Sequence, residues 1–333
     1  MHSPLDINAL LDPEIAEALA TLKLDSATLS NETLAQIRAN RAAQPFAPVS
    51  GRVERNEHKI PGRLAVNVRV HRQKTTSSPS PGQSPGPPPE KLPCIYWMHG
   101  GGLVLGTNLR DDARFDHWCQ SLNCVGVSVE YGLAPESTYP GPLEDCYAGL
   151  AWVHANAEVL GIDINRVGIG GSSAGAGLAA ALALLARDRG EIPIAFQALI
   201  YPMLDDRQIT TSSQWADPVW PAQANRFGWD SYLGGLAGDA VPQYAAAARA
   251  TNLSGLPPAF ISVGALDGFS DEDTEYATRL RHAGVACEFH LYPGAPHGFD
   301  SMLPNTRIAQ RANRALEQWL AGQLHGARYK DVG

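Results

Sequence analysis

The chain has 333 residues, a length that fits two domains of average size or one large domain with an insertion. Hydrophobic residues make up 44% of it and charged residues 18%, which allows a sizeable core and excludes a chain that is disordered throughout. The formal net charge is −8 and no cluster of Lys and Arg stands out, so a basic surface for nucleic acid or anionic lipid is excluded.

The first fifty residues are expected to be helical. Asp12-Pro13-Glu14 is a typical helix start, with proline at the first helical position. Residues 64–70 alternate apolar and polar side chains, which predicts a half-buried strand. Residues 75–89 contain six Pro, four Ser and two Gly, so they cannot bury enough apolar surface to become ordered. A disordered insertion is predicted there.

From residue 92 onward, short apolar runs alternate with helical patterns. Strands are predicted at 92–98, 124–130, 166–170, 195–200, 259–264 and 286–292. Helices are predicted at 142–160, 174–189, 271–284 and 305–322. Buried strands separated by helices predict an α/β fold with a mostly parallel sheet covered on both faces. The interval 203–256 is longer than a crossover helix requires and contains three Trp, which indicates a lid or cap.

Segments for export or membrane insertion are not expected. The first residues carry neither a positive region nor an apolar one, and the longest apolar run, 178–186, is too short to span a bilayer. The five cysteines are scattered and form no CxxC pair, which favours free thiols over disulfides or a zinc site. A cytoplasmic protein is therefore expected, without a membrane or nucleic-acid partner; a homodimer is compatible with the sequence.

The sharpest motif is Gly171-Ser172-Ser173-Ala174-Gly175. This G-x-S-x-G sequence lies between a predicted strand and a predicted helix, the setting in which such a serine is exposed as a nucleophile. A turn of small residues is the structural alternative. A second alternative uses Gly175-Ala176-Gly177, which begins a G-x-G-x-x-A dinucleotide-binding pattern, but its first glycine lies beyond the turn rather than in it.

A run of three glycines, Gly100, Gly101 and Gly102, follows His99 at the end of the predicted strand 92–98. Glycines there allow backbone N–H groups to approach a ligand, and H-G-G-G loops supply oxyanion-hole donors in esterases and lipases. A flexible tight turn is the alternative, although three entropically costly glycines after a strand are hard to justify structurally. His99 precedes the serine and is interpreted as a loop-organising residue.

The acid and the base are predicted after the serine, in the order Ser, Asp, His. Asp267 follows the strand 259–264 and His297 follows the strand 286–292, so both lie at the carboxyl edge of the sheet. The rival acids are expected to complement a helix dipole or to open the cap; they are Asp271, Glu272, Asp273, Glu275, Asp205 and Asp206. The rival bases His282 and His290 lie inside a predicted helix and strand. The prediction is that Ser173 attacks an acyl carbonyl, His297 takes its proton and Asp267 orients the imidazole, with oxyanion donors from Gly100, Gly101 and Ala174.

With these motifs the chain resembles the hormone-sensitive-lipase-like esterases, also called bacterial lipolytic family IV or fold-3 α/β-hydrolases. The resemblance covers about residues 92–202 and 255–320 and rests on the motifs at 99–102, 131–136, 139–145, 171–175, 267 and 297–299. Two positions depart from the family pattern: Ser172 stands where Asp or Glu is usual, and Gly268-Phe269 replaces Pro-Leu.

The resemblance implies an α/β-hydrolase fold with a helical cap, carboxylester hydrolysis, and no metal or cofactor. It also implies a catalytic domain over 51–202 and 251–333 and a cap over 1–50 and 203–250. The expected function is a serine carboxylesterase that acts on small-molecule esters with short- to medium-chain acyl groups. An amidase or deacetylase with the same triad, a non-catalytic ligand-binding protein and a nucleotide-dependent enzyme are the alternatives.

Overall fold

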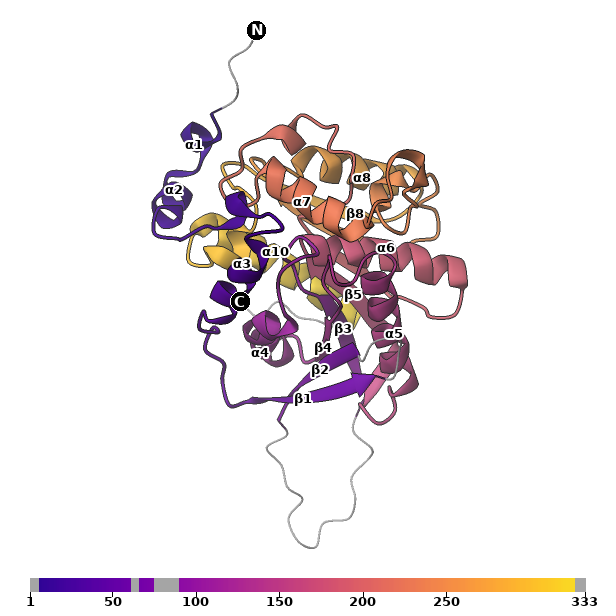
Figure 1. The fold of residues 1–333 in the computed structure, drawn as a ribbon. Coiled ribbons are helices and arrows are strands. Elements are labelled where there is room, and N and C mark those ends of the chain that lie inside the picture. The colour runs from indigo at the N-terminus through magenta and orange to yellow at the C-terminus, as the bar shows by residue number, and fades with distance from the viewer. Residues whose placement is uncertain (1–5, 61–65, 75–89, 327–333) are drawn as a thin grey trace, which may run out of the picture.

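An eight-stranded sheet forms the centre of the protein, as Figure 1 shows for the computed structural model, which describes residues 6–60, 66–74 and 90–326. The strands are β1 (Val53–Ile60), β2 (Val66–Gln73), β3 (Leu92–Met98), β4 (Val125–Glu130), β5 (Ile162–Ser172), β6 (Gln197–Ile200), β7 (Ala259–Gly264) and β8 (Cys287–Tyr292). Their order across the sheet is β1-β2-β4-β3-β5-β6-β7-β8. β1 and β2 are antiparallel to their neighbours and the remaining strands pair in parallel, which confirms the predicted mostly parallel sheet.

Helices cover both faces of the sheet (Figure 1). They are α1 (Ile7–Leu10), α2 (Pro13–Leu19), α3 (Leu34–Ala42), α4 (Asp112–Ser121), α5 (Gly141–Ala155), α6 (Ala174–Arg189), α7 (Ala222–Leu233), α8 (Ser270–His282), α9 (Phe299–Met302) and α10 (Arg307–His325). Tyr96 and Met98 of β3 join one core cluster with α5, α6 and α8, whereas Ile95 and Trp97 join another with α4 and α10. This two-residue alternation is what a strand buried on both faces requires.

Several elements differ from the sequence prediction. The strand β1 was not predicted, because only its end residues Val53 and Ile60 are buried and the residues between them are polar. Neither α4 nor α7 was predicted. The first fifty residues are less helical than expected, since α1, α2 and α3 are short and no helix includes residues 43–50. The predicted insertion at 75–89 lies outside the described residues.

The predicted helix start at Asp12 is present. Its Oδ1 accepts a hydrogen bond of 2.9 Å from the backbone N–H of Glu14, and Pro13 is the first residue of α2. This hydrogen bond satisfies one of the free N–H groups at the start of the helix.

None of the helices in the described ranges is long and apolar enough to cross a bilayer.

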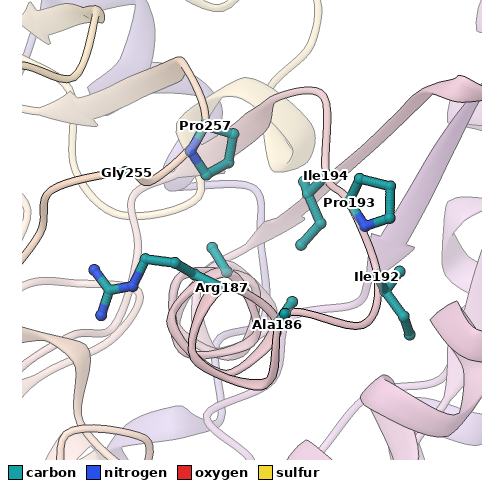
Figure 2. Close-up of a pocket in the computed structure, with 9 residues that line it drawn as sticks. Ala186, Arg187, Ile192, Pro193, Ile194, Gly255 and Pro257 are labelled. Carbon is teal, nitrogen blue, oxygen red and sulfur yellow. The ribbon is translucent and has the colours of Figure 1, made fainter.

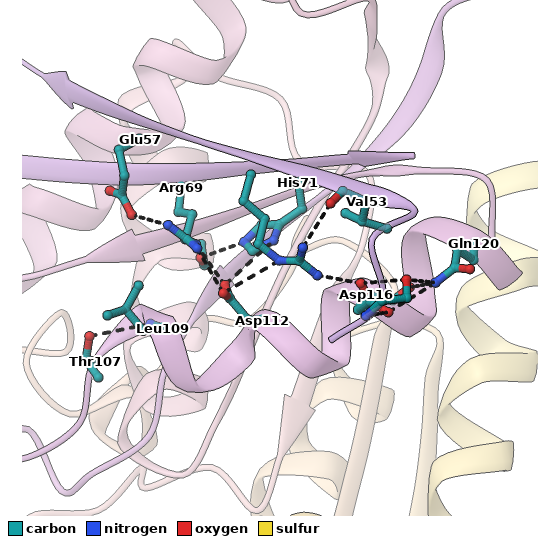
Figure 3. A network of polar contacts seen from close by, with 12 residues as sticks. Val53, Glu57, Arg69, His71, Thr107, Leu109, Asp112, Asp116 and Gln120 are labelled. Carbon is teal, nitrogen blue, oxygen red and sulfur yellow. Dashed lines mark hydrogen bonds and ion pairs between the residues drawn. The ribbon is translucent and has the colours of Figure 1, made fainter. Parts of the chain in front are cut away.

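A network of charged side chains ties β1 and β2 to α4 (Figure 3). The guanidinium of Arg69 donates to Asp112 at 2.8 Å and to Glu57 at 2.7 Å. Behind it, the His71 ring is fully buried, stacks on Phe115 at 4.6 Å and shares a 3.2 Å hydrogen bond with the Ser128 hydroxyl. Burial lowers the pKa of His71 to about 3, and the charges of nearby arginines act in the same direction.

The buried neutral His71 is expected to make folding stability fall as the pH falls. Below pH 6.5 the unfolded chain takes up a proton at this histidine, whereas the folded chain does not until about pH 3. The free energy of unfolding should therefore decrease by up to about 1.4 kcal/mol per pH unit across this window. Urea unfolding of wild type and His71→Gln between pH 4 and 7 measures this slope. The slope should flatten in His71→Gln and persist in His282→Gln, whose side chain is exposed.

Candidate active site

Ser173 lies at the sharp turn between β5 and α6. Its backbone angles, φ 56° and ψ −122°, are a strained combination for a residue with a side chain, and they project the side chain out of the turn. The turn also brings α6 close to β3, because a Cβ at Gly175 would lie 2.2 Å from the Met98 carbonyl oxygen. Similarly, a Cβ at Gly177 would lie 2.1 Å from the Met203 carbonyl oxygen. Protein backbone therefore occupies the space beside both glycines, which argues against a pyrophosphate site there.

The structure brings Ser173, His297 and Asp267 into one hydrogen-bonded chain. His297 Nε2 is 2.9 Å from Ser173 Oγ, and His297 Nδ1 is 2.8 Å from Asp267 Oδ2. The other oxygen of Asp267 accepts the backbone N–H of Phe269 at 2.9 Å. All three side chains are buried, and each comes from the carboxyl end of a different parallel strand. The arrangement can pass a proton from a serine hydroxyl to an imidazole that a carboxylate orients.

The environment of His297 favours its protonated form. Burial is the largest single influence and lowers the pKa, but the charge and hydrogen bond of Asp267 raise it, as do the charges of Asp217 and Asp300. The net result is a pKa above the usual value. An imidazole that binds a proton readily in a buried site is suited to act as a base.

The glycine loop lies beside the serine. A Cβ at Gly100 would lie 3.4 Å from Ser173 Cβ, and Ala174 begins α6 directly after the serine. Gly101 has φ +131°, an angle that side chains rarely permit. A Cβ at Gly102 would lie 2.1 Å from the Trp220 ring, so only glycine leaves room for that ring. Two of the residues predicted as oxyanion donors, Gly100 and Ala174, thus lie beside Ser173, and Gly101 follows Gly100 in the same loop.

His99 supports this loop from behind. Its ring stacks on Tyr131 at 4.2 Å, and its Nδ1 is 2.9 Å from the Gly100 carbonyl oxygen. The Tyr131 hydroxyl donates a 2.7 Å hydrogen bond to the carbonyl oxygen of His99. These contacts fit the loop-organising role predicted for His99.

The rival carboxylates other than Asp273 have other partners or are exposed. Asp271 accepts the backbone N–H of Ser212 at 2.8 Å, and Glu272 accepts those of Leu204 and Asp205. Asp205 forms an ion pair with Arg207, and Asp206 forms one with Arg249. Glu275 is exposed, and Asp273 is fully buried with a pKa that burial raises well above its usual value. The rival bases lie as predicted, with His282 ending α8 and His290 in β8.

Three side chains around His297 were not predicted from the sequence. Asp217 accepts the backbone N–H of His297 at 2.9 Å. The Tyr201 ring lies 4.7 Å from the His297 ring, and its hydroxyl donates a 2.6 Å hydrogen bond to Asp300. The only local signals are the Asp217-Pro218 dipeptide, which favours a turn, and the position of Asp300 three residues after His297.

Within the described part of the chain, neither a metal cluster nor the hollow at the end of α6 competes with this site. No group of three or more His, Cys, Asp or Glu side chains among residues 6–60, 66–74 and 90–326 could hold a metal ion. A surface hollow lined by Arg187, Ile194 and Pro257 lies at the end of α6 (Figure 2). The first residue of α6 that lines the hollow is Ala183, ten residues after Ser173, so about 15 Å of helix separates the serine from the hollow.

The chain is similar in sequence to an α/β-hydrolase family and to individual esterases. Residues 95–301 match the sequence model of a family described as having the alpha/beta hydrolase fold. The esterase LipI of Mycobacterium tuberculosis is 35% identical over 243 residues, which cover 72% of this chain and 76% of that protein. The carboxylesterase NlhH of the same organism is 36% identical over 63% of this chain and 67% of its own length.

Solved structures of esterases are also similar to this chain. A bacterial heroin esterase superposes with a TM-score of 0.83 at 37% identity and covers 95% of this chain and 99% of its own. The esterase LipW of Mycobacterium marinum superposes with a TM-score of 0.78 at 34% identity, over 97% of this chain and 98% of its own. The similarity therefore extends over nearly the whole length of both solved chains.

Proposed function

Because this chain belongs to the α/β-hydrolase family, and within it to the hormone-sensitive-lipase-like esterases, we propose that it hydrolyses short- to medium-chain acyl esters through Ser173, His297 and Asp267. Its esterase relatives make it a carboxylic ester hydrolase. The observation that carries the proposed triad is the unbroken chain of 2.9 Å and 2.8 Å contacts from the serine hydroxyl through the imidazole to the carboxylate.

In this mechanism Ser173 Oγ attacks the ester carbonyl while His297 Nε2 takes the hydroxyl proton. The tetrahedral intermediate collapses, His297 returns the proton to the leaving alcohol, and the acyl group stays on Ser173. Water, activated by the same imidazole, then releases the carboxylic acid. Asp267 keeps the proton-bearing Nδ1 directed away from the serine and stabilises the imidazolium. The N–H groups of Gly100, Gly101 and Ala174 are proposed to hold the oxyanion, where each such donor is worth about 3 kcal/mol of barrier.

We assign residues 51–202 and 251–333 to the catalytic domain and residues 1–50 and 203–250 to a cap. Support comes from α7 and the loop before it, since Trp220 lies against Gly102 and a Cβ at Gly228 would lie 2.6 Å from the Gly102 carbonyl oxygen. Trp220 and Trp229 are both buried in the main core cluster, so they pack the cap rather than line an open groove. The burial of Ser173 also supports small esters over long acyl chains as substrates.

A series of p-nitrophenyl esters from acetate to palmitate tests the chain length, and the matching anilides test amide cleavage. The expected result is highest kcat/KM with the short and medium esters and slow turnover of anilides. A fluorophosphonate should form a single covalent adduct on Ser173, which peptide mass spectrometry would locate. An adduct on another residue, or no adduct, would contradict the proposed nucleophile, and a maximum at palmitate would contradict the proposed substrate range.

The raised pKa of His297 sets the expected pH dependence. The imidazole must be neutral to accept the serine proton, so kcat/KM should fall as the pH is lowered, with a midpoint above the usual histidine value of 6.5. Steady-state rates with one ester from pH 5 to pH 9 measure this limb. A midpoint below 6.5 would show that burial outweighs the carboxylates around the ring.

A further inference from the structure

Asp217 is buried in the loop before α7, on the cap side of the site, and both of its oxygens are used. Oδ2 accepts the backbone N–H of His297 at 2.9 Å. Oδ1 accepts the backbone N–H groups of Val219 and Trp220 at 2.7 and 2.9 Å, which closes a turn two and three residues further along the chain. A single carboxylate therefore joins the main chain of the proposed base to a turn in the proposed cap.

The two residues held by this turn each contact a different catalytic loop. Trp220 lies against Gly102 in the oxyanion loop. Val219 packs in a small core cluster with Phe299 and Leu303, which follow His297, and with Ile15 of α2. Because protein cores transmit small displacements rather than absorb them, a shift of the 217–220 turn would move the histidine loop relative to the glycine loop.

Three carboxylates face the His297 ring from different elements. Asp267 comes from the loop between β7 and α8, Asp217 from the loop before α7, and Asp300 from α9. Asp300 is balanced by the Tyr201 hydroxyl and by Arg114 at 3.9 Å. For Asp217, burial and the charge of Asp267 raise the pKa to about 6, against the opposing effects of His297 and of the backbone N–H groups. Asp217 is therefore ionised at neutral pH and adds negative charge beside the imidazole.

We propose that Asp217 is a positioning residue for the base: its carboxylate fixes the His297 main chain against the cap turn and adds charge that stabilises the imidazolium. The proposal rests on the proposed triad and deepens it. Under this proposal the Asp217 carboxylate, which belongs to the cap segment, aligns the catalytic His297. The cap and the base would therefore move together.

Two variants remove Asp217's contribution in different ways. In Asp217→Ser the short hydroxyl can still accept the N–H groups of the turn but cannot reach His297, so the turn is kept and the tie is lost. In Asp217→Asn the side chain keeps its reach but loses its charge, and its NH₂ group must face one of the N–H donors. Asp205→Asn is the matched control, since Asp205 is also buried in the 203–250 segment but pairs with Arg207.

Both Asp217 variants are expected to lower kcat by about ten- to a hundredfold, the range in which a small misplacement of a catalytic group acts, with KM changed by less than about threefold. The acid limb of kcat/KM should also move to lower pH, because a charge that raises the His297 pKa has been removed. Asp205→Asn should keep both the kcat and the acid limb of wild type. Circular dichroism and thermal unfolding establish that each variant is folded.

A kcat within about twofold of wild type, or an unshifted acid limb, in a folded Asp217 variant would overturn the proposal and leave only a structural role. Either variant alone suffices for this test if the other does not fold. If neither folds, the proton resonance of the His297 Nδ1–H is followed in the wild type from pH 4 to pH 8, and a titration that shows no inflection besides that of His297 itself overturns the proposal. Ser173→Ala, measured in parallel, separates the test of the triad from the test of Asp217. Wild-type activity in Ser173→Ala would contradict the proposed triad. An unchanged kcat in the Asp217 variants would contradict only the role proposed for Asp217.

Discussion

Replacing Ser173 by alanine should lower ester hydrolysis by about 10⁵-fold or more, because no other nucleophile meets the imidazole in this site. His297 Nε2 is 2.9 Å from the serine oxygen, and that oxygen is the only atom the substitution removes. The strained backbone at this position already carries a side chain with a Cβ, so alanine fits the same φ of 56° and the fold should be kept. Initial rates with a short p-nitrophenyl ester measure the loss.

The neighbouring serine provides a matched control. Ser172 Oγ is buried and has no hydrogen-bond partner within the described part of the chain, so Ser172→Ala removes an unsatisfied hydroxyl and should change turnover by no more than a few-fold. Fluorophosphonate labelling should disappear in Ser173→Ala and persist in Ser172→Ala. Wild-type rates in Ser173→Ala, or labelling lost in Ser172→Ala alone, would mean that the wrong serine has been assigned.

The sequence predicted the parts of the fold that depend on local pattern. Strands β3 and β7 were predicted with their observed bounds, because each is a short apolar run that ends at a glycine-rich or polar loop. The three residues that meet in the site could be proposed because parallel strands place their carboxyl ends at one edge, so residues far apart in the chain converge there. The chain order of serine, acid and base then reduced the choice among the acidic residues.

The features that the sequence did not predict depend on tertiary contacts. β1 is an edge strand whose inner positions are polar, so neither alternation nor apolar content distinguishes it from a loop. Asp217 contacts a residue 80 positions away through a backbone N–H, an interaction that leaves no mark on the partner's side chain. Similarly, the Tyr201 ring lies 4.7 Å from the His297 ring, and the Tyr201 backbone has a φ of 39°, an uncommon angle for a residue with a side chain.

Asp267→Asn should lower kcat by about 10⁴-fold while leaving the fold and the substrate affinity nearly unchanged. The Asn oxygen can still accept the Phe269 N–H, which leaves the amide NH₂ facing His297 Nδ1. Nδ1 must then act as the acceptor, so the proton moves to Nε2 and the imidazole can no longer take the proton of Ser173. Asp271→Asn, a change to a carboxylate that accepts the backbone N–H of Ser212 instead, should retain wild-type kcat.

If Asp267→Asn kept more than about a tenth of the wild-type kcat, the orienting charge would have to come from another group that raises the His297 pKa. Asp217 has the largest such effect after Asp267. The double variant Asp267→Asn with Asp217→Asn tests this. If Asp217 shares the role of Asp267, Asp217→Asn should lower kcat by a larger factor in the Asp267→Asn background than in wild type.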